Sequence, residues 1–170
     1  MDDLPKEKLF ARLRLRGMNP EDDPEFIRMA GWTRLTFALC TAGAGIATVS
    51  SSVPVLVTMM GIAVIGAAME RHPFDYVYNG VIRRFTGTLK LPTNGVPTRF
   101  ACTIGAVWFL ALAVLFHNGF DNAGYVLGAM FVAVGSLVST THFCIPSLIF
   151  QFLFGDRSLI IPSITGRARV

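Results

Sequence analysis

Residues 35 to 69, LTFALCTAGAGIATVSSSVPVLVTMMGIAVIGAAM, decide the fold, because 35 consecutive positions contain no Lys, Arg, Asp or Glu. A second uncharged run covers residues 122–155, and a third covers residues 100–116. A charge at the bilayer centre costs about 2.5 to 3.5 kcal/mol on insertion scales, so long uncharged runs are typical of membrane-spanning segments. The sequence therefore predicts an integral membrane protein.

The first run is too long for one span. As a single helix it would measure about 52 Å, against a hydrocarbon core of about 30 Å. Ser50-Ser51-Ser52 followed by Pro54 is the natural break, since serines cap helices and proline is tolerated in a first turn. We therefore expect an all-α fold, a four-span transmembrane helical bundle, with spans at about 32–49, 53–69, 100–116 and 124–143.

The chain has 170 residues and 52% hydrophobic content, which fits one membrane domain over residues 32–155 and no sizeable soluble domain. The 31 residues before it and residues 156–170 are expected to be a cytoplasmic segment and a cytoplasmic tail. The first 34 residues do not read as a signal peptide, and the sequence has no lipidation motif. Anchoring by spanning helices is the expectation.

The basic residues predict the orientation. Of 15 Lys and Arg, seven precede the first span, five lie between the second and third, and three follow the fourth. The other two loops have none. Under the positive-inside rule, both termini and the middle loop face the cytoplasm and the two tight hairpins face outward.

Three further segments are neither plain loops nor spans. Residues 4–16 alternate basic and apolar positions, which fits either a helix on an anionic membrane surface or a solvated tail. Residues 74–86 carry apolar side chains at helical spacing, with Asp75 and Asn79 opposite and Gly87 placed to end the helix, and predict an amphipathic interfacial helix. Residues 146–154 are too short to cross and too apolar to be solvated, which predicts a re-entrant or interfacial helix.

Reactive side chains accumulate at the predicted cytoplasmic ends of the spans. Cys40 and Cys102 lie one or two turns inside the boundary, and His72, His142 and Cys144 lie at it. We expect a polar cluster there, drawn from Glu70, Arg71, His72, Asp75, Arg99, Cys102, His142 and Cys144. His117, at the opposite end of its span, reads as a solvated loop residue.

This cluster has three interpretations. In the first, Cys144 is a reactive or sulfur-carrying thiolate, helped by His142, by nearby arginines and by the helix that begins at Pro146; Cys102 and His72 are further catalytic candidates. In the second, these residues bind a metal, but no Cys-x-x-Cys or His-x-x-x-His spacing is present, so neither a metal nor another cofactor is expected. In the third, the cysteines are small hydrophobes and the histidines hydrogen-bond helix ends.

The interiors of the spans carry only Thr, Ser and Cys as polar groups, which disfavours charge-coupled transport. Small residues at four-residue spacing predict close helix packing instead. The residues expected to contact a partner are Leu148 and Phe152 in the short apolar segment and Gly135 and Ser139 on the fourth span. Lipid and a second copy or a larger membrane complex are the expected partners, and nucleic acid is not.

Three stretches carry a resemblance: Arg71-His72-Pro73-Phe74-Asp75, Pro97-Thr98-Arg99-Phe100-Ala101-Cys102 and Thr140-Thr141-His142-Phe143-Cys144-Ile145-Pro146. They resemble a bacterial family of small four-helix membrane proteins classed as a domain of unknown function, over about residues 28–155. The resemblance implies a prokaryotic inner-membrane protein and supplies no activity.

From the sequence we expect an accessory or scaffold protein that packs in a homo-oligomer or larger membrane complex, and not an enzyme. The alternative is a thiol-dependent membrane protein that handles sulfur or redox equivalents at the cytoplasmic face. A narrow channel for a small neutral solute is the third possibility.

Overall fold

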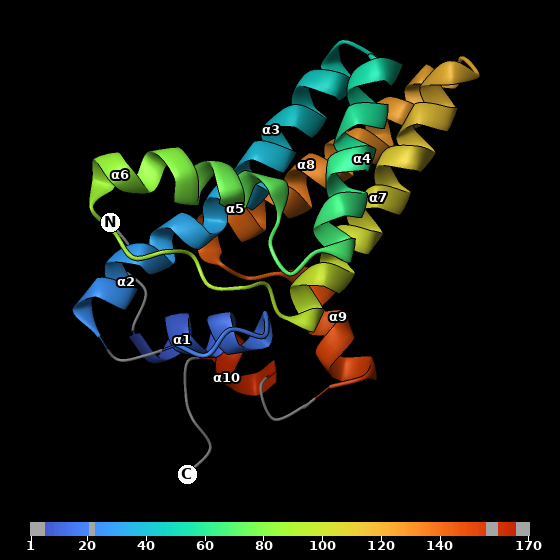
Figure 1. Cartoon of the computed structure of the whole chain (residues 1–170). Helices are drawn as coiled ribbons and strands as arrows, with labels where there is room; N and C mark the ends of the chain where they lie inside the picture. The colour runs from blue at the N-terminus through green and yellow to red at the C-terminus, as the bar shows by residue number, and fades with distance from the viewer. Residues whose placement is uncertain (1–5, 21–22, 156–159, 166–170) are drawn as a thin grey trace.

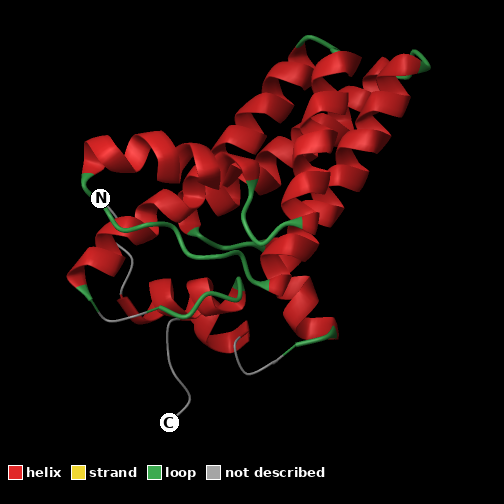
Figure 2. Cartoon of the chain, viewed as in Figure 1, coloured by secondary structure: helices red, strands yellow, loops and turns green. Residues whose placement is uncertain are grey.

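In the computed structural model, which describes residues 6–20, 23–155 and 160–165, all regular structure is helical (Figure 2). The helices in chain order are α1 (Lys6–Leu15), α2 (Pro24–Ala30), the 3-10 turn η1 (Gly31–Arg34), α3 (Leu35–Val49), α4 (Val53–Ala68), α5 (Pro73–Val77), the π-helical turn η2 (Tyr78–Ile82), α6 (Arg83–Thr86), α7 (Val96–His117), α8 (Asp121–Thr141), α9 (Ile145–Leu153) and α10 (Ile160–Thr165). The predicted all-α class is confirmed.

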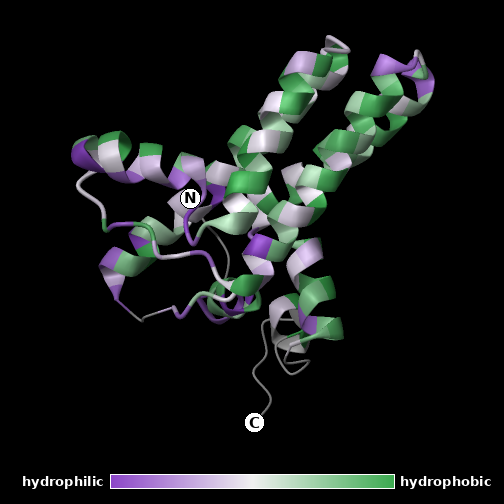
Figure 3. Cartoon of the chain, turned by 45° about the vertical axis from the view of Figure 1, so that its right-hand side comes forward, coloured by the Kyte–Doolittle hydropathy of each residue, from purple (hydrophilic) through white to green (hydrophobic). Residues whose placement is uncertain are grey.

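Helices α3, α4, α7 and α8 form a bundle, and apolar residues concentrate along it (Figures 1 and 3). Among the helices of the described residues, α7 and α8, with 22 and 21 residues, are long and apolar enough to cross a membrane, and the bent pair of α4 with Pro73–Thr86 would make a third span. α3 and α4 have only 15 and 16 residues and are about 23 Å long. α3 is short because the preceding four residues form the 3-10 turn η1, and α4 is short because it ends before Met69. The described helices thus supply two to three candidate spans.

Within the bundle, α4 packs mainly along α7, and α3 along α8. Small residues make the second pairing close: a Cβ added at Gly128 would lie 2.4 Å from the Thr48 side chain, and one at Gly135 would lie 2.2 Å from that of Thr41. The helix backbones therefore approach within a distance that a larger side chain would prevent. Phe109 and Leu112 are buried in the hydrophobic core of this bundle.

A second core lies at the end of the bundle opposite the Ser50–Ser52 and 118–120 turns, and α1, α2 and η2 supply most of its residues (Figure 1). Leu9 and Leu13 of α1 pack there with Phe26, Met29 and Tyr78. A solvated tail is therefore wrong for residues 6–15. A surface helix is correct only in part, because these leucines are buried against protein.

The middle loop contains continuous helix from Pro73 to Thr86, which ends at Gly87 with φ +62°. It makes an angle of 82° with α4. Its orientation reverses part of the predicted face: Asp75 and Tyr78 point into the protein, whereas Val77, Val81 and Phe85 are exposed, Phe85 by 87%. The inward face thus combines the polar Asp75 with Tyr78 and Ile82 of the second core, and the outward face carries apolar side chains beside Arg83 and Arg84.

Candidate polar and thiol site

Arg16 is the centre of the candidate site. It follows α1, and Gly17 with φ +79° turns the chain directly after it. The side chain is only 1% exposed. It donates from Nη1 to Thr33 Oγ1 at 3.3 Å and from Nη2 to the Thr33 carbonyl at 3.1 Å, and its guanidinium carbon lies 4.7 Å from the centre of the Phe37 ring.

The Arg16 guanidinium is incompletely satisfied. Within the described part of the chain, its Nε has no hydrogen-bond partner. A buried cation without a full set of partners is costly, so this atom marks a place where a partner is expected. Burial lowers the pKa of Arg16, while the nearby Cys144, Asp75 and Cys102 act in the opposite direction.

Asp75 does not fill that place, because its oxygens are used elsewhere. Thr36 Oγ1 donates to Oδ1 at 2.6 Å, and the His72 backbone N–H and Asn94 Nδ2 donate to Oδ2 at 3.0 and 2.9 Å. The carboxylate thereby joins α3, α5 and the loop before α7.

A small polar cavity lies between these groups. Its volume is about 10 Å³, near the space that one water needs. Its lining includes Arg16, Thr36, His72, Asp75, Asn94 and Cys102. The site can therefore hold one group of about the size of a water molecule.

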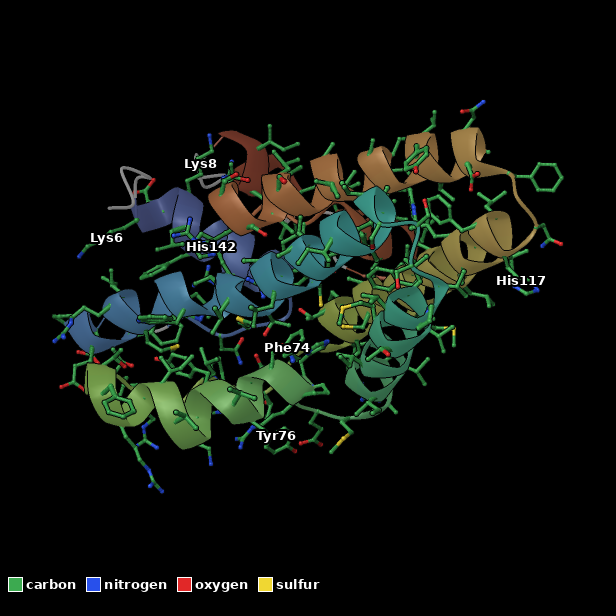
Figure 4. The ribbon with its side chains drawn as sticks, turned by 90° about the horizontal axis from the view of Figure 1, so that it is seen from above. Lys6, Lys8, Phe74, Tyr76, His117 and His142 are labelled. Carbon is green, nitrogen blue, oxygen red and sulfur yellow. The ribbon has the colours of Figure 1, made fainter. Side chains whose placement is uncertain are left out.

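His72 caps α5. Its Nδ1 accepts from the Phe74 N–H at 3.4 Å, and its ring packs on Gly66 of α4, where an added Cβ would meet it at 2.2 Å. Phe74 lies beside it near the junction of α5 with the bundle (Figure 4). Burial lowers the pKa of His72 and Asp75 opposes that shift, so the folded protein favours the neutral imidazole.

The structure brings the predicted thiols to the same end of the bundle. Cys102 lines the polar cavity, and Cys144 stands at the start of α9, 1% exposed, against Ala101 and Val138. Both lie within electrostatic reach of Arg16. Cys40 lies on α3 and is partly exposed.

His142 ends α8 in a left-handed conformation, with φ +59° and a buried ring. Burial lowers its pKa to about 3, and the positive charges of Arg16, Arg34 and Arg12 add to that shift. A neutral imidazole contributes no positive charge toward a Cys144 thiolate. Positive charge for that role comes from the neighbouring arginines, of which Arg16 is the one buried over Phe37.

Other predicted members of the cluster have structural roles. Arg99 donates to the carbonyls of Ala67 and Ala68 at the end of α4, at 2.9 and 3.0 Å. The Glu70 carbonyl accepts from the Asn94 N–H at 2.7 Å. His117 lies at the opposite end of the bundle from His142 (Figure 4). Among the described residues, no group of three or more His, Cys, Asp and Glu side chains could hold a metal ion.

The four residues predicted to contact a partner lie in two different environments. Gly135 packs on Thr41 of the same chain, and Ser139 Oγ donates to the Gly135 carbonyl at 2.7 Å. On α9, Phe152 is exposed and Leu148 is half-buried. The α9 pair therefore lies at the surface, whereas the α8 pair is used within the bundle.

Sequence reasoning missed Arg16, which it placed on a surface helix or in a tail. Its position depends on a contact between Gly17 and Gly95 that only the folded structure reveals. An added Cβ on Gly95 would lie 2.6 Å from the Gly17 carbonyl oxygen, so the two loops touch backbone to backbone. This contact holds Arg16 beside Asn94 and Thr98, and Thr98 Oγ1 donates to the Arg16 carbonyl at 2.9 Å.

The low pKa of His142 predicts a pH-dependent stability. The unfolded chain, with a histidine pKa near 6.5, binds a proton that the folded chain does not bind until about pH 3. Stability should therefore be complete above about pH 6.5 and fall by about 1.4 kcal/mol per pH unit below it. His142→Asn, which suits a left-handed position, should reduce this slope in thermal unfolding from pH 7 to pH 4. His117→Asn is the control, and an unchanged slope in His142→Asn would contradict the assignment.

Comparison with known proteins gives a family and no activity. No curated protein and no solved structure matches the chain. A family model described as "Domain of unknown function (DUF4395)" matches residues 23–154, which include α2 to α9 and every candidate site residue except Arg16. The chain belongs to this family of unknown function.

Proposed function

We propose that the chain is a four-span protein of a prokaryotic cytoplasmic membrane, with both termini and the α5–α6 segment on the cytoplasmic side. The 3-10 turn η1 continues directly into α3 and lengthens this short span. The turns at residues 50–52 and 118–120 share one end of the bundle, and no basic residue lies in either (Figure 1). The 12 Lys and Arg among the described residues lie before α3 or between α4 and the first turn of α7, which supports this orientation under the positive-inside rule.

The α5–α6 segment suits the membrane interface. Since it runs at 82° to α4, it lies nearly in the membrane plane if α4 follows the membrane normal. Its exposed stripe of Val77, Val81 and Phe85 would then face acyl chains, and Arg83 and Arg84 would lie at headgroup level.

Labelling tests this topology. Single cysteines at Ser51 and Asn118 should react with an impermeant maleimide added outside intact cells, and one at Lys90 should react only after permeabilisation. Lys90 suits this test because it is exposed, so its labelling depends on the side of the membrane and not on burial. Asn94 in the same loop is less suitable, because its side chain donates to Asp75. Labelling of the Lys90 cysteine in intact cells would overturn the orientation.

We further propose that the protein acts through the thiol of Cys144, with Arg16 as the residue that stabilises its anionic form. The observation that carries this proposal is the Arg16 guanidinium. It is buried, and its Nε is unpartnered in the described chain. It shares a cavity with Cys102 and lies over Phe37, which packs against the cluster that contains Cys144. A neighbouring arginine favours the thiolate, which is the nucleophilic form. Because Asp75 is engaged elsewhere, a thiolate formed at Cys144 would supply a counter-charge for Arg16.

The chemistry of such a site is thiol exchange. The Cys144 thiolate attacks one sulfur of a disulfide or persulfide, and a new S–S bond joins Cys144 Sγ to that sulfur. The other sulfur leaves with the electron pair of the broken bond and takes up a proton. Cys102 supplies a second thiol on the cavity beside Arg16.

Replacement of Arg16 tests the thiol function. In the full chain in lipid nanodiscs, Arg16→Gln should slow modification of Cys144 by an uncharged thiol reagent at pH 7 by roughly tenfold, equivalent to about 1.4 kcal/mol. Peptide mass spectrometry resolves Cys144 from Cys40 and Cys102. Arg14→Gln is the matched control, because Arg14 is exposed on α1, two residues before Arg16. Arg16→Lys should restore much of the rate if charge is the cause, and equal rates in Arg16→Gln and the parent would end the proposal.

A scaffold function is the second candidate, and α9 favours it. Its polar side chains point inward: Ser147 Oγ donates to the Pro97 carbonyl and Gln151 Nε2 to the Leu15 carbonyl, both at 3.3 Å. Its apolar side chains Ile149, Leu153 and Phe154 are exposed. Such a face suits lipid or a second copy of the chain.

Charge on this face tests the scaffold candidate. If α9 joins two copies, Ile149→Arg with Leu153→Arg should convert the oligomer to a monomer in native mass spectrometry from mild detergent. Arg84→Ala, on the exposed part of α6, should leave the oligomer intact. An oligomer that survives both arginines would assign the α9 face to lipid.

A further inference from the structure

A second cavity adjoins Cys144. It has a volume of about 90 Å³ and lies between α7, α8 and the start of α9. Its lining is apolar and includes Phe37, Ala101, Gly105, Val134 and Val138. Of the described side chains that line it, only Trp108 and Cys144 carry a polar group.

The Trp108 polar group is already used, because its Nε1 donates to the Leu127 carbonyl at 3.1 Å. The Cys144 thiol is thus the reactive group that this cavity presents. The side chains that surround the Cys144 thiol in this cavity are apolar. Arg16 lies over the ring of Phe37, which also lines the cavity.

A second hollow lies beside this cavity, toward the outer surface of α7. This larger hollow of about 320 Å³ is lined by Thr103, Val107 and Ala111 of α7 and by Leu127 of α8, and Ile104 and Trp108 line both spaces. Val107 is 63% exposed, on the surface that the proposed topology assigns to lipid. The two hollows therefore adjoin each other at Ile104 and Trp108, with Cys144 on the inner one and the exposed surface of α7 at the outer one.

We propose that Cys144 acts on an uncharged, lipid-soluble sulfur compound that enters from the bilayer between α7 and α8. This inference rests on the proposed thiol function and names its substrate class. A charged molecule would lose its hydration in a cavity that offers it few polar partners, which is unfavourable, whereas an apolar one is stabilised there. Cys144 is almost closed to water, so the apolar path is the entrance that the structure provides.

The volumes set the shape of this substrate. A cavity of about 150 Å³ admits benzene, so 90 Å³ holds a group of only a few heavy atoms. The reactive disulfide or persulfide end fits there, and an apolar remainder extends into the outer hollow beyond Trp108. Exchange then follows the step given above: Cys144 Sγ bonds to the attacked sulfur, and the second sulfur departs with the electron pair.

Two methanethiosulfonate reagents of the same reactive group test the route. In nanodiscs, the uncharged decyl reagent should modify Cys144 at least tenfold faster than the charged sulfonatoethyl reagent, each rate normalised to that of Cys40, which lies on α3 and does not line either hollow. Both reagents form an S–S bond to the thiol and release methanesulfinate. A charged reagent that is as fast as the uncharged one would place the entrance in water and overturn the inference.

A glycine pair provides the matched variants. A Cβ at Gly105 meets no atom within 4 Å and lines the cavity, so Gly105→Leu should fill it and slow the decyl reagent at Cys144 at least fivefold. Gly61 on α4 is equally open and lies away from both hollows, so Gly61→Leu should leave the rate unchanged. Equal rates in Gly105→Leu and Gly61→Leu would also overturn the route. If Arg16→Gln left the rate of Cys144 modification unchanged, by contrast, the thiol function itself would fail. A failure of the entry route and a failure of the thiol function are therefore distinguishable.

Discussion

The carbonyl groups at the C-terminal ends of α4 and α8 impose the constraint on which the rest of the structure depends. A helix leaves its last four carbonyls without internal partners, and at a membrane boundary they need donors. Arginines supply these donors. Arg99 donates to α4. At α8, Arg34 Nη1 donates to the Thr140 carbonyl at 2.7 Å, and Arg12 donates to the Thr141 carbonyl. The cations also complement the negative ends of the helix dipoles. The basic residues that predict orientation therefore also tie the N-terminal segment to the bundle.

This arrangement explains why a polar network can exist beside an apolar bundle. Arg12 reaches α8 and α10 from α1, since its Nε donates to the Ser163 carbonyl at 3.1 Å. Once α1 is fixed, Arg16, one helical turn further on, lies over Phe37 and faces Asp75, His72 and Cys102 across a cavity of about 10 Å³. A buried arginine of this kind contributes little net stability, because its desolvation offsets its hydrogen bonds. Its position at a cavity shared with Asp75, His72 and Cys102 fits the proposed chemical role better than a stabilising one.

The sequence predicts the helices better than the site, for a physical reason. Uncharged runs and Pro54 identify α3, α4, α7 and α8 within a few residues, because bilayer insertion and proline geometry act locally. Cys102, His72 and Asp75 were also expected at one end, since that follows from helix order alone. Arg16 was not, because its position depends on the contact between Gly17 and Gly95, which are 78 positions apart and carry no periodic signal. The outward turn of Val77, Val81 and Phe85 follows from burial of Asp75 by Thr36 and Asn94, which is also a tertiary effect.

Cys144 lies where the two environments of the protein meet, and this position links the proposals. On one side Arg16 offers a fixed positive charge in a site nearly closed to water, where an electrostatic interaction is stronger than in solution. On the other side, Phe37, Ala101 and Val138 provide an apolar wall. Phe37 belongs to both, since one of its faces carries the Arg16 guanidinium and its ring also lines the apolar cavity. A thiolate formed at this boundary keeps its counter-charge inside the protein, so an uncharged substrate can approach it without bringing an ion into the bilayer.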